Sequence, residues 1–170
     1  KIEGDQIHFD LNQLRKLPNY KSYLYQWLYE YGFTAWEDIY DLVDGQSGKQ
    51  VFSSEFRLLK NRDFLILSPE NLDDEDEEYY VFKDQKEVNF PLNLSFSRVS
   101  EISLVSNTTI FVDEDKLWYP LVLRRWRQGD NFQPIGMDGK SKKVSKFFKD
   151  HKLSLIEKEN VWILCSDNQI

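Results

Sequence analysis

Three arginines close together, Arg124, Arg125 and Arg127, are the residues whose type and spacing best suit a chemical task. Burying so many guanidinium groups without partners is costly, so at least two of them should reach solvent or an anion. The planar fork of an arginine matches the oxygens of a phosphate group. The cluster therefore favours binding of nucleic-acid phosphates, and the alternative is ion pairing with the acidic part of the chain.

These arginines belong to a basic segment, residues 116–152, in a chain that is acidic as a whole. The segment holds ten Lys and Arg against three Asp, a balance of +7, whereas all 170 residues together carry a net charge of −7. So uneven a charge distribution indicates a partner of opposite charge. The candidate phosphate contacts are Arg124, Arg125, Arg127, Lys140, Lys142, Lys143, Lys146 and Lys149.

A short basic helix is predicted over Ser141–Asp150, with Val144, Phe147 and Phe148 on its apolar face. The lysines at 142, 146 and 149 then lie on the opposite side. The lysines at 140, 142 and 143 crowd the first turn, where the helix dipole disfavours cations. An anion bound at that turn would compensate for this, which again points to phosphate.

Three other patterns give weaker evidence for a functional site: a glycine-rich stretch, the two histidines and the single cysteine. The glycine-rich stretch Gly45–Gln50 precedes a predicted strand rather than a helix, so a turn is expected there and not a nucleotide loop. The two histidines, His8 and His151, have no partner at metal-ligand spacing. The single cysteine, Cys165, stands in an apolar strand and is expected to be a buried thiol. No catalytic residue and no metal ligand is assigned.

The first 72 residues predict a small unit of two helices followed by strands. Helices are expected at about 20–31 and 35–44, the second with a capping box of Thr34 and Glu37. Two of the strands that follow flank a tight hairpin at Asn61-Arg62.

The acidic run Asp73–Glu78 is expected to be a linker, and residues 79–170 a second, β-rich domain with the one short basic helix. Its strands are predicted at 79–83, 93–100, 109–113, 119–126 and 160–166. The fold class is therefore α+β. No apolar run is long enough for a membrane helix, and no signal peptide is evident, so no membrane partner and a cytoplasmic location are expected.

The residues 123–153, LRRWRQGDNFQPIGMDGKSKKVSKFFKDHKL, resemble the C-terminal domain signature of bacterial tRNA(Ile)-lysidine synthetases. The stretches LYQWLYEYGF and GQSGKQVFSSEFRLLKNRDFLIL resemble the central substrate-recognition domain of the same family. The pyrophosphatase-type loop of its catalytic domain, Ser-Gly-Gly-x-Asp-Ser, has no counterpart here. The chain is therefore expected to be the tRNA-recognition part of the enzyme and inactive alone.

The resemblance implies an ATP-dependent carbon–nitrogen ligase that converts the wobble cytidine of an isoleucine tRNA with a CAU anticodon to lysidine. It implies that ATP and magnesium bind the absent catalytic domain and that this chain holds no cofactor but clamps tRNA. It also implies that the second domain resembles a β module of a phenylalanyl-tRNA synthetase subunit, and it leaves a homodimer open. Two alternatives remain, a protein-interaction module with a basic docking face and a general RNA-binding domain.

Overall fold

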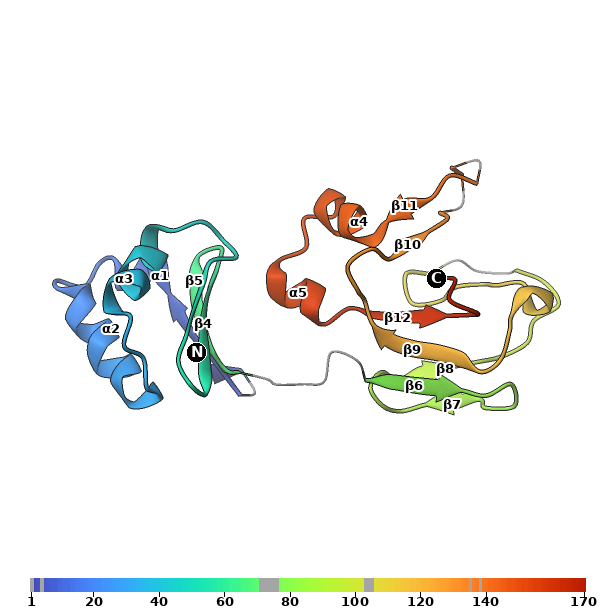
Figure 1. Ribbon diagram of the computed structural model, residues 1–170, viewed down its shortest axis with the longest axis horizontal. Helices are drawn as coiled ribbons and strands as arrows, with labels where there is room; N and C mark the ends of the chain where they lie inside the picture. Colours follow the sequence, from blue (N-terminus) through green and yellow to red (C-terminus); the bar gives the residue numbers. More distant parts are fainter. Residues whose placement is uncertain (1, 4, 71–76, 103–105, 135, 138) are drawn as a thin grey trace. The chain divides into compact units, whose positions relative to one another are not determined.

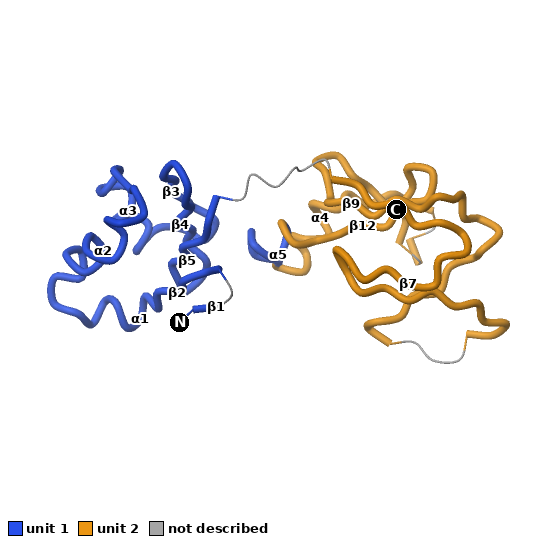
Figure 2. Tube along the Cα trace, turned by 90° about the horizontal axis from the view of Figure 1, so that it is seen from below, with its two compact units in different colours: residues 1–73, 153–158 blue, residues 74–152, 159–170 orange. Residues whose placement is uncertain are grey.

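The chain folds into two compact units, which are described separately. The computed structural model describes residues 2–3, 5–70, 77–102, 106–134, 136–137 and 139–170. Unit 1 comprises residues 1–73 and 153–158, and unit 2 comprises residues 74–152 and 159–170 (Figure 2). Helices and strands are mixed in the chain, as the α+β class requires. Most of the acidic run Asp73–Glu78 lies outside the described residues, and only its last two positions are described.

Unit 1 is an antiparallel sheet combined with short helices (Figure 1). The strands follow the order β1-β2-β5-β4-β3 across the sheet. They are β1 (Ile2–Glu3), β2 (Gln6–Asp10), β3 (Gln50–Phe52), β4 (Phe56–Asn61) and β5 (Phe64–Pro69). The helices are α1 (Leu11–Leu14), α2 (Tyr20–Leu28), the 3-10 turn η1 (Tyr29–Tyr31) and α3 (Trp36–Asp44).

The core of unit 1 is built from leucines at helical and strand spacing. Leu24 and Leu28 lie four residues apart on α2 and are both fully buried. Ile39 and Val43 have the same separation on α3 and are also fully buried. Leu58, Leu65 and Leu67 of the sheet belong to the same cluster of buried side chains. The helix predicted at 20–31 is α2 followed by η1. Its apolar face is narrower than predicted, because Tyr23 and Trp27 remain 38% and 41% exposed.

Two local predictions in unit 1 are wrong. The hairpin turn is Arg62-Asp63, one residue later than expected, since Asn61 pairs with Phe64 as the last rung of the ladder. Arg62 takes the left-handed φ of 52° that the first position of such a turn needs. The expected capping box is absent, because α3 has Ala35 at its N-cap and no side chain caps it.

Unit 2 contains a three-stranded antiparallel sheet in which β9 lies between β12 and β6 (Figure 1). These strands are β6 (Glu78–Val81), β9 (Leu121–Arg125) and β12 (Trp162–Cys165). Two smaller hairpins pair β7 (Glu87–Val88) with β8 (Leu94–Ser95) and β10 (Asn131–Phe132) with β11 (Lys142–Lys143). The remaining elements are η2 (Glu114–Lys116), α4 (Val144–Asp150) and α5 (Leu155–Glu159).

Three predictions for the second half of the chain differ from the structure. Residues 110–113 form no strand, and only Leu94–Ser95 of the predicted strand 93–100 is one. The basic helix begins at Val144 rather than Ser141, because residues 142 and 143 pair with β10 instead. A second helical segment, α5, was not predicted, and its residues 155–158 are grouped with unit 1.

Candidate nucleic-acid interface

The first candidate arginine, Arg124, is held by an aspartate of the following turn. Its Nη1 and Nη2 atoms donate to the two carboxylate oxygens of Asp130, each at 2.9 Å. The side chains are only 12% and 13% exposed. A two-pronged pair of this kind is among the strongest polar contacts in proteins. Arg124 therefore has a structural partner of its own, and its predicted phosphate contact stays a prediction.

Asp130 also joins β9 to the start of α4. Its carboxylate accepts the backbone N–H of Arg127 at 2.6 Å, and its carbonyl oxygen accepts the N–H of Val144 at 2.9 Å. The hydrogen bonds from Arg124 and from the Arg127 backbone hold the pKa of Asp130 below its usual value, although burial opposes them. The same pair raises the pKa of Arg124. Asp130 thus fixes the turn that leads into the basic segment.

The other two arginines have different surroundings. Arg127 pairs with Glu78 at 3.1 Å, and these side chains are 41% and 30% exposed. Glu78 is both the last residue of the acidic run and the first of β6, so one acid of that run does pair with the basic segment. Arg125 pairs with no carboxylate among the described residues and lies over the ring of Trp162, with its Cζ atom 4.2 Å from the ring centroid.

Lys142 is also engaged within the molecule. Its Nζ atom lies 2.9 Å from the carboxylate of Asp150 and 5.4 Å from the ring centroid of Phe147. Lys142 belongs to β11, which precedes the helix. Its side chain contacts the ring of Phe147, although it was predicted to lie opposite the apolar face that contains this ring. The prediction that lysines crowd the first turn of a helix is therefore wrong, because only Lys143, at the N-cap, adjoins α4. The pairing lowers the pKa of Asp150.

Four candidate lysines remain exposed and form no ion pair within the described parts of the chain. On α4, Val144 and Phe148 are buried, and the lysines at 143, 146 and 149 follow one another at three-residue spacing on the opposite side. A row of exposed cations without ion-pair partners attracts a polyanion, and it does so more strongly at low salt. We call these the exposed lysines: Lys140, Lys143, Lys146 and Lys149.

Sequence reasoning missed the residues that organise this surface. Asp130 was given no role, and neither Glu78 nor Trp162 was connected to the arginines. A usable signal exists for Asp130, since an aspartate after a Gly in a turn close to several arginines is well placed to accept from them. Glu78 and Trp162 come from distant parts of the chain, and no local pattern indicates their contacts.

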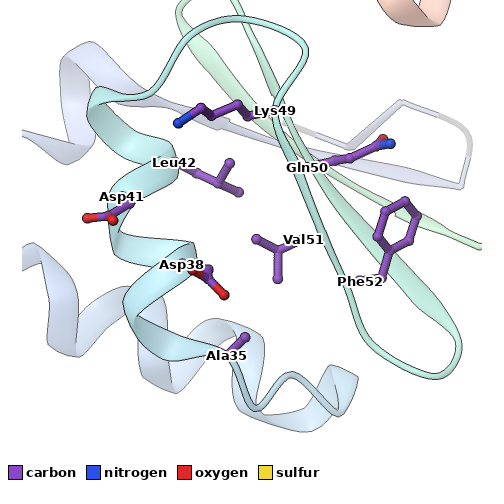
Figure 3. Close-up of a pocket in the computed structure, with 8 residues that line it drawn as sticks. All are labelled: Ala35, Asp38, Asp41, Leu42, Lys49, Gln50, Val51 and Phe52. Carbon is purple, nitrogen blue, oxygen red and sulfur yellow. The ribbon is translucent and has the colours of Figure 1, made fainter.

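A pocket on unit 1 is lined partly by acidic side chains, unlike the basic candidate interface. It measures about 440 Å³ and lies between α3 and β3, where Leu42 and Val51 point toward one another (Figure 3). Asp38, Asp41 and Lys49 are among its lining residues. The two carboxylates make the pocket unsuited to a phosphate chain, so it is not joined to the candidate interface.

Other kinds of site find little support among the described residues. They contain no group of three or more His, Cys, Asp or Glu side chains that could hold a metal ion. Within the same ranges, no helix is long and apolar enough to cross a membrane. Cys165 is buried, as predicted, and burial raises the pKa of its thiol, which keeps it protonated and unreactive.

Comparison with known proteins gives a consistent result along the whole chain. Residues 2–70 match the family model described as the TilS substrate binding domain. A tRNA(Ile)-lysidine synthase of Parabacteroides distasonis is 40% identical over 99% of the chain. The tRNA(Ile)-lysidine synthases of Bacteroides thetaiotaomicron and Porphyromonas gingivalis are 35% and 27% identical over 90% and 94% of the chain. The family resemblance predicted from the sequence is confirmed.

The chain corresponds to only part of these relatives. It covers 39%, 34% and 38% of the lengths of the three proteins. Both units are included, since the similarity to the first relative runs over nearly all 170 residues.

Proposed function

We propose that this chain, as a relative of the tRNA(Ile)-lysidine synthases, binds tRNA and holds it for modification. The observation that carries the proposal is the row of exposed lysines on and beside α4, which form no ion pair among the described residues. Phosphates along an RNA strand supply the anions that such a row attracts, and release of their counterions favours binding.

The finer assignments belong to the same proposal. The tRNA is an isoleucine tRNA with a CAU anticodon, whose wobble cytidine becomes lysidine. Activation by ATP and magnesium and the attack of lysine take place on residues outside this chain, which has no Ser-Gly-Gly-x-Asp-Ser loop. The protein works in the cytoplasm, and the sheet of β6, β9 and β12 corresponds to the β module of a phenylalanyl-tRNA synthetase subunit.

The direct test reverses two exposed charges. The double variant K146E/K149E changes side chains that project to solvent, so the fold should persist. Loss of two phosphate contacts and the added repulsion should weaken binding to an isoleucine-tRNA transcript by about tenfold or more at low salt. Fluorescence anisotropy with labelled tRNA measures the dissociation constant.

A matched control comes from the same unit. Lys83 and Lys86 are also exposed but lie on the segment between β6 and β7. The variant K83E/K86E carries the same charge change, so it should bind tRNA nearly as the wild type does. Equal weakening by both variants would show an effect of net charge alone, and no weakening by K146E/K149E would refute the assignment.

The ion pair between Glu78 and Arg127 favours a second candidate, in which the acidic run covers the basic surface. Serine at all five acidic positions of residues 73–77 removes that cover while leaving Glu78 in β6. If the run competes with RNA, tRNA affinity should rise well beyond that of the wild type. A plain linker would leave the affinity nearly unchanged.

A further inference from the structure

Arg125 and Trp162 form a contact that the exposed lysines do not explain. They are directly opposite one another in the ladder of β9 and β12, so their side chains project from the same face of the sheet. The guanidinium Cζ atom lies 4.2 Å from the centroid of the indole. At this distance a cation interacts favourably with an aromatic face.

Two further aromatic rings extend this contact toward solvent. The ring of Tyr79 lies 5.6 Å from that of Trp162, and the ring of Phe90 lies 5.4 Å from that of Tyr79, both in edge-to-face geometry. Trp162 and Tyr79 are half-buried, whereas Phe90 is 67% exposed. A connected row of rings therefore leads from the interior to an aromatic surface in contact with water.

The guanidinium of Arg125 also lacks an acceptor. Its Nη1 atom is buried and has no hydrogen-bond partner among the described residues. The neighbouring arginines differ, because Arg124 is paired with Asp130 and Arg127 with Glu78. A buried donor without an acceptor costs free energy. Arg125 is therefore the arginine of the cluster that no carboxylate of the described residues engages, and an external anion would bind at the nitrogens of its half-buried guanidinium other than Nη1.

We propose that Arg125, Trp162, Tyr79 and Phe90 form a site for one unpaired nucleotide of the bound RNA. The base stacks on the exposed ring of Phe90, and a phosphate or base edge of the same unpaired segment accepts from the guanidinium of Arg125. The nucleotide is unpaired because a base inside a duplex has both faces covered by its neighbours. This proposal rests on the proposed function and adds a contact of a different kind to the lysine row.

The exposure of Phe90 separates this proposal from simple packing. Phe90 is 67% exposed and also contacts the ring of Tyr79, whereas the similarly exposed Phe82 has no ring contact among the described residues. A site for phosphate alone would need the arginine but no exposed ring. The two alternatives therefore predict different behaviour for a variant that removes only the ring of Phe90.

The test compares F90A with F82A in the full chain. Phe82 is 62% exposed in the same unit and has no ring contact among the described residues, so F82A controls for the loss of an exposed phenylalanine. Stacking of one base is worth about 1–3 kcal/mol, so F90A should weaken tRNA binding by about 5- to 150-fold. The salt dependence should stay as in the wild type, because no charge is lost. F82A should change neither quantity.

A second variant tests the arginine. R125K keeps the charge but loses the planar group, so it should weaken binding without changing the slope with salt. Thermal unfolding of each variant checks that the fold is retained. Wild-type affinity in both F90A and R125K would overturn the site, as would equal losses in F90A and F82A. Failure of the wild type to bind tRNA would instead refute the proposed function.

Discussion

The two units carry almost the same net charge, −4 for residues 1–73 and 153–158 and −3 for residues 74–152 and 159–170, but they distribute it differently. Residues 2–70 hold seven Lys and Arg against eleven Asp and Glu, a balance of −4, whereas residues 116–152 carry +7. Yet residues 2–70 are the part that matches a substrate binding domain. Attraction of RNA phosphates is therefore expected to come from this basic segment of unit 2, and recognition of the substrate from unit 1.

The units also differ in what holds them together. Unit 1 is built around one cluster of eleven buried apolar residues. In unit 2, the turn between β9 and α4 depends on a polar contact, the pair of Arg124 and Asp130. Apolar packing is not sensitive to pH, whereas a carboxylate pair is. The two units should therefore respond differently to mutation and to acid, and five predictions test this contrast and the charge distribution.

The largest effect is expected from L28A in unit 1. Leu28 is fully buried, so its truncation leaves a cavity and should lower the free energy of unfolding by about 3 kcal/mol. Hydrogen exchange should accelerate in β4 and β5 but not in β9 and β12. Equal acceleration in both units would show that they unfold as one cooperative body.

D130N should have the next largest effect, confined to unit 2. It leaves the guanidinium of Arg124, which is 12% exposed, facing a neutral partner and should cost about 2 kcal/mol of stability at pH 7. Exchange of the β9 and α4 amides reports the loss. Unchanged protection of these amides would contradict the role given to Asp130.

The pH dependence of that loss follows from the lowered pKa of Asp130. A depressed carboxyl pKa stabilises the folded state above the ordinary value of about 3.9, and the contribution is lost as pH falls through the lower folded value. The stabilities of wild type and D130N should therefore begin to converge as the pH falls below that ordinary value, and they should meet below the lowered pKa of folded Asp130. A difference that persisted undiminished in acid would assign the effect to packing.

The charge contrast is tested by matched pairs of lysines. K140Q/K143Q in unit 2 removes two exposed charges and should lower the slope of log Kd against log salt by about 2. K16Q/K49Q removes two exposed charges from unit 1 and should leave the slope nearly unchanged. Equal slopes for the two variants would remove the electrostatic distinction between the units.

The smallest effect is expected from K142Q. The ammonium of Lys142 is already paired with Asp150, so it has little left to offer a phosphate. Its neutralisation should therefore weaken tRNA binding much less than K146Q does. Comparison of the two dissociation constants under the same salt conditions checks this. Equal losses of affinity in K142Q and K146Q would show that Lys142 also contacts a phosphate.

Much of unit 1 could be predicted because its signals are local. Leu24 and Leu28 are four positions apart, and so are Ile39 and Val43. This separation places each pair on one helix face, so the sequence alone identifies both helices. The basic helix was predicted too long because its true start depends on a contact that is distant in sequence. Lys143 pairs with Asn131, twelve positions earlier, and periodicity within the helix cannot reveal that pairing. The extra strand moved the lysines away from the first helical turn.

The candidate site was predictable as a segment but not residue by residue. Composition identifies a basic stretch, and the family resemblance covers it. Which cations are exposed depends on Asp130, Glu78 and Asp150. Asp130 and Asp150 lie within eight residues of the cations they pair with, whereas Glu78 lies 49 residues from Arg127. Arg125 is the clearest case, because its aromatic partner Trp162 comes from β12, a strand that lies far from it in sequence.

The central claim is that this chain holds tRNA through the exposed lysines of unit 2. The most direct measurement is the dissociation constant of the whole chain for an isoleucine-tRNA transcript across a salt series, with an elongator methionine tRNA as the comparison. Binding through four lysines predicts that log Kd rises with log salt with a slope of about 3 to 4. Absence of binding at low salt, or affinity that does not change with salt, would contradict the account.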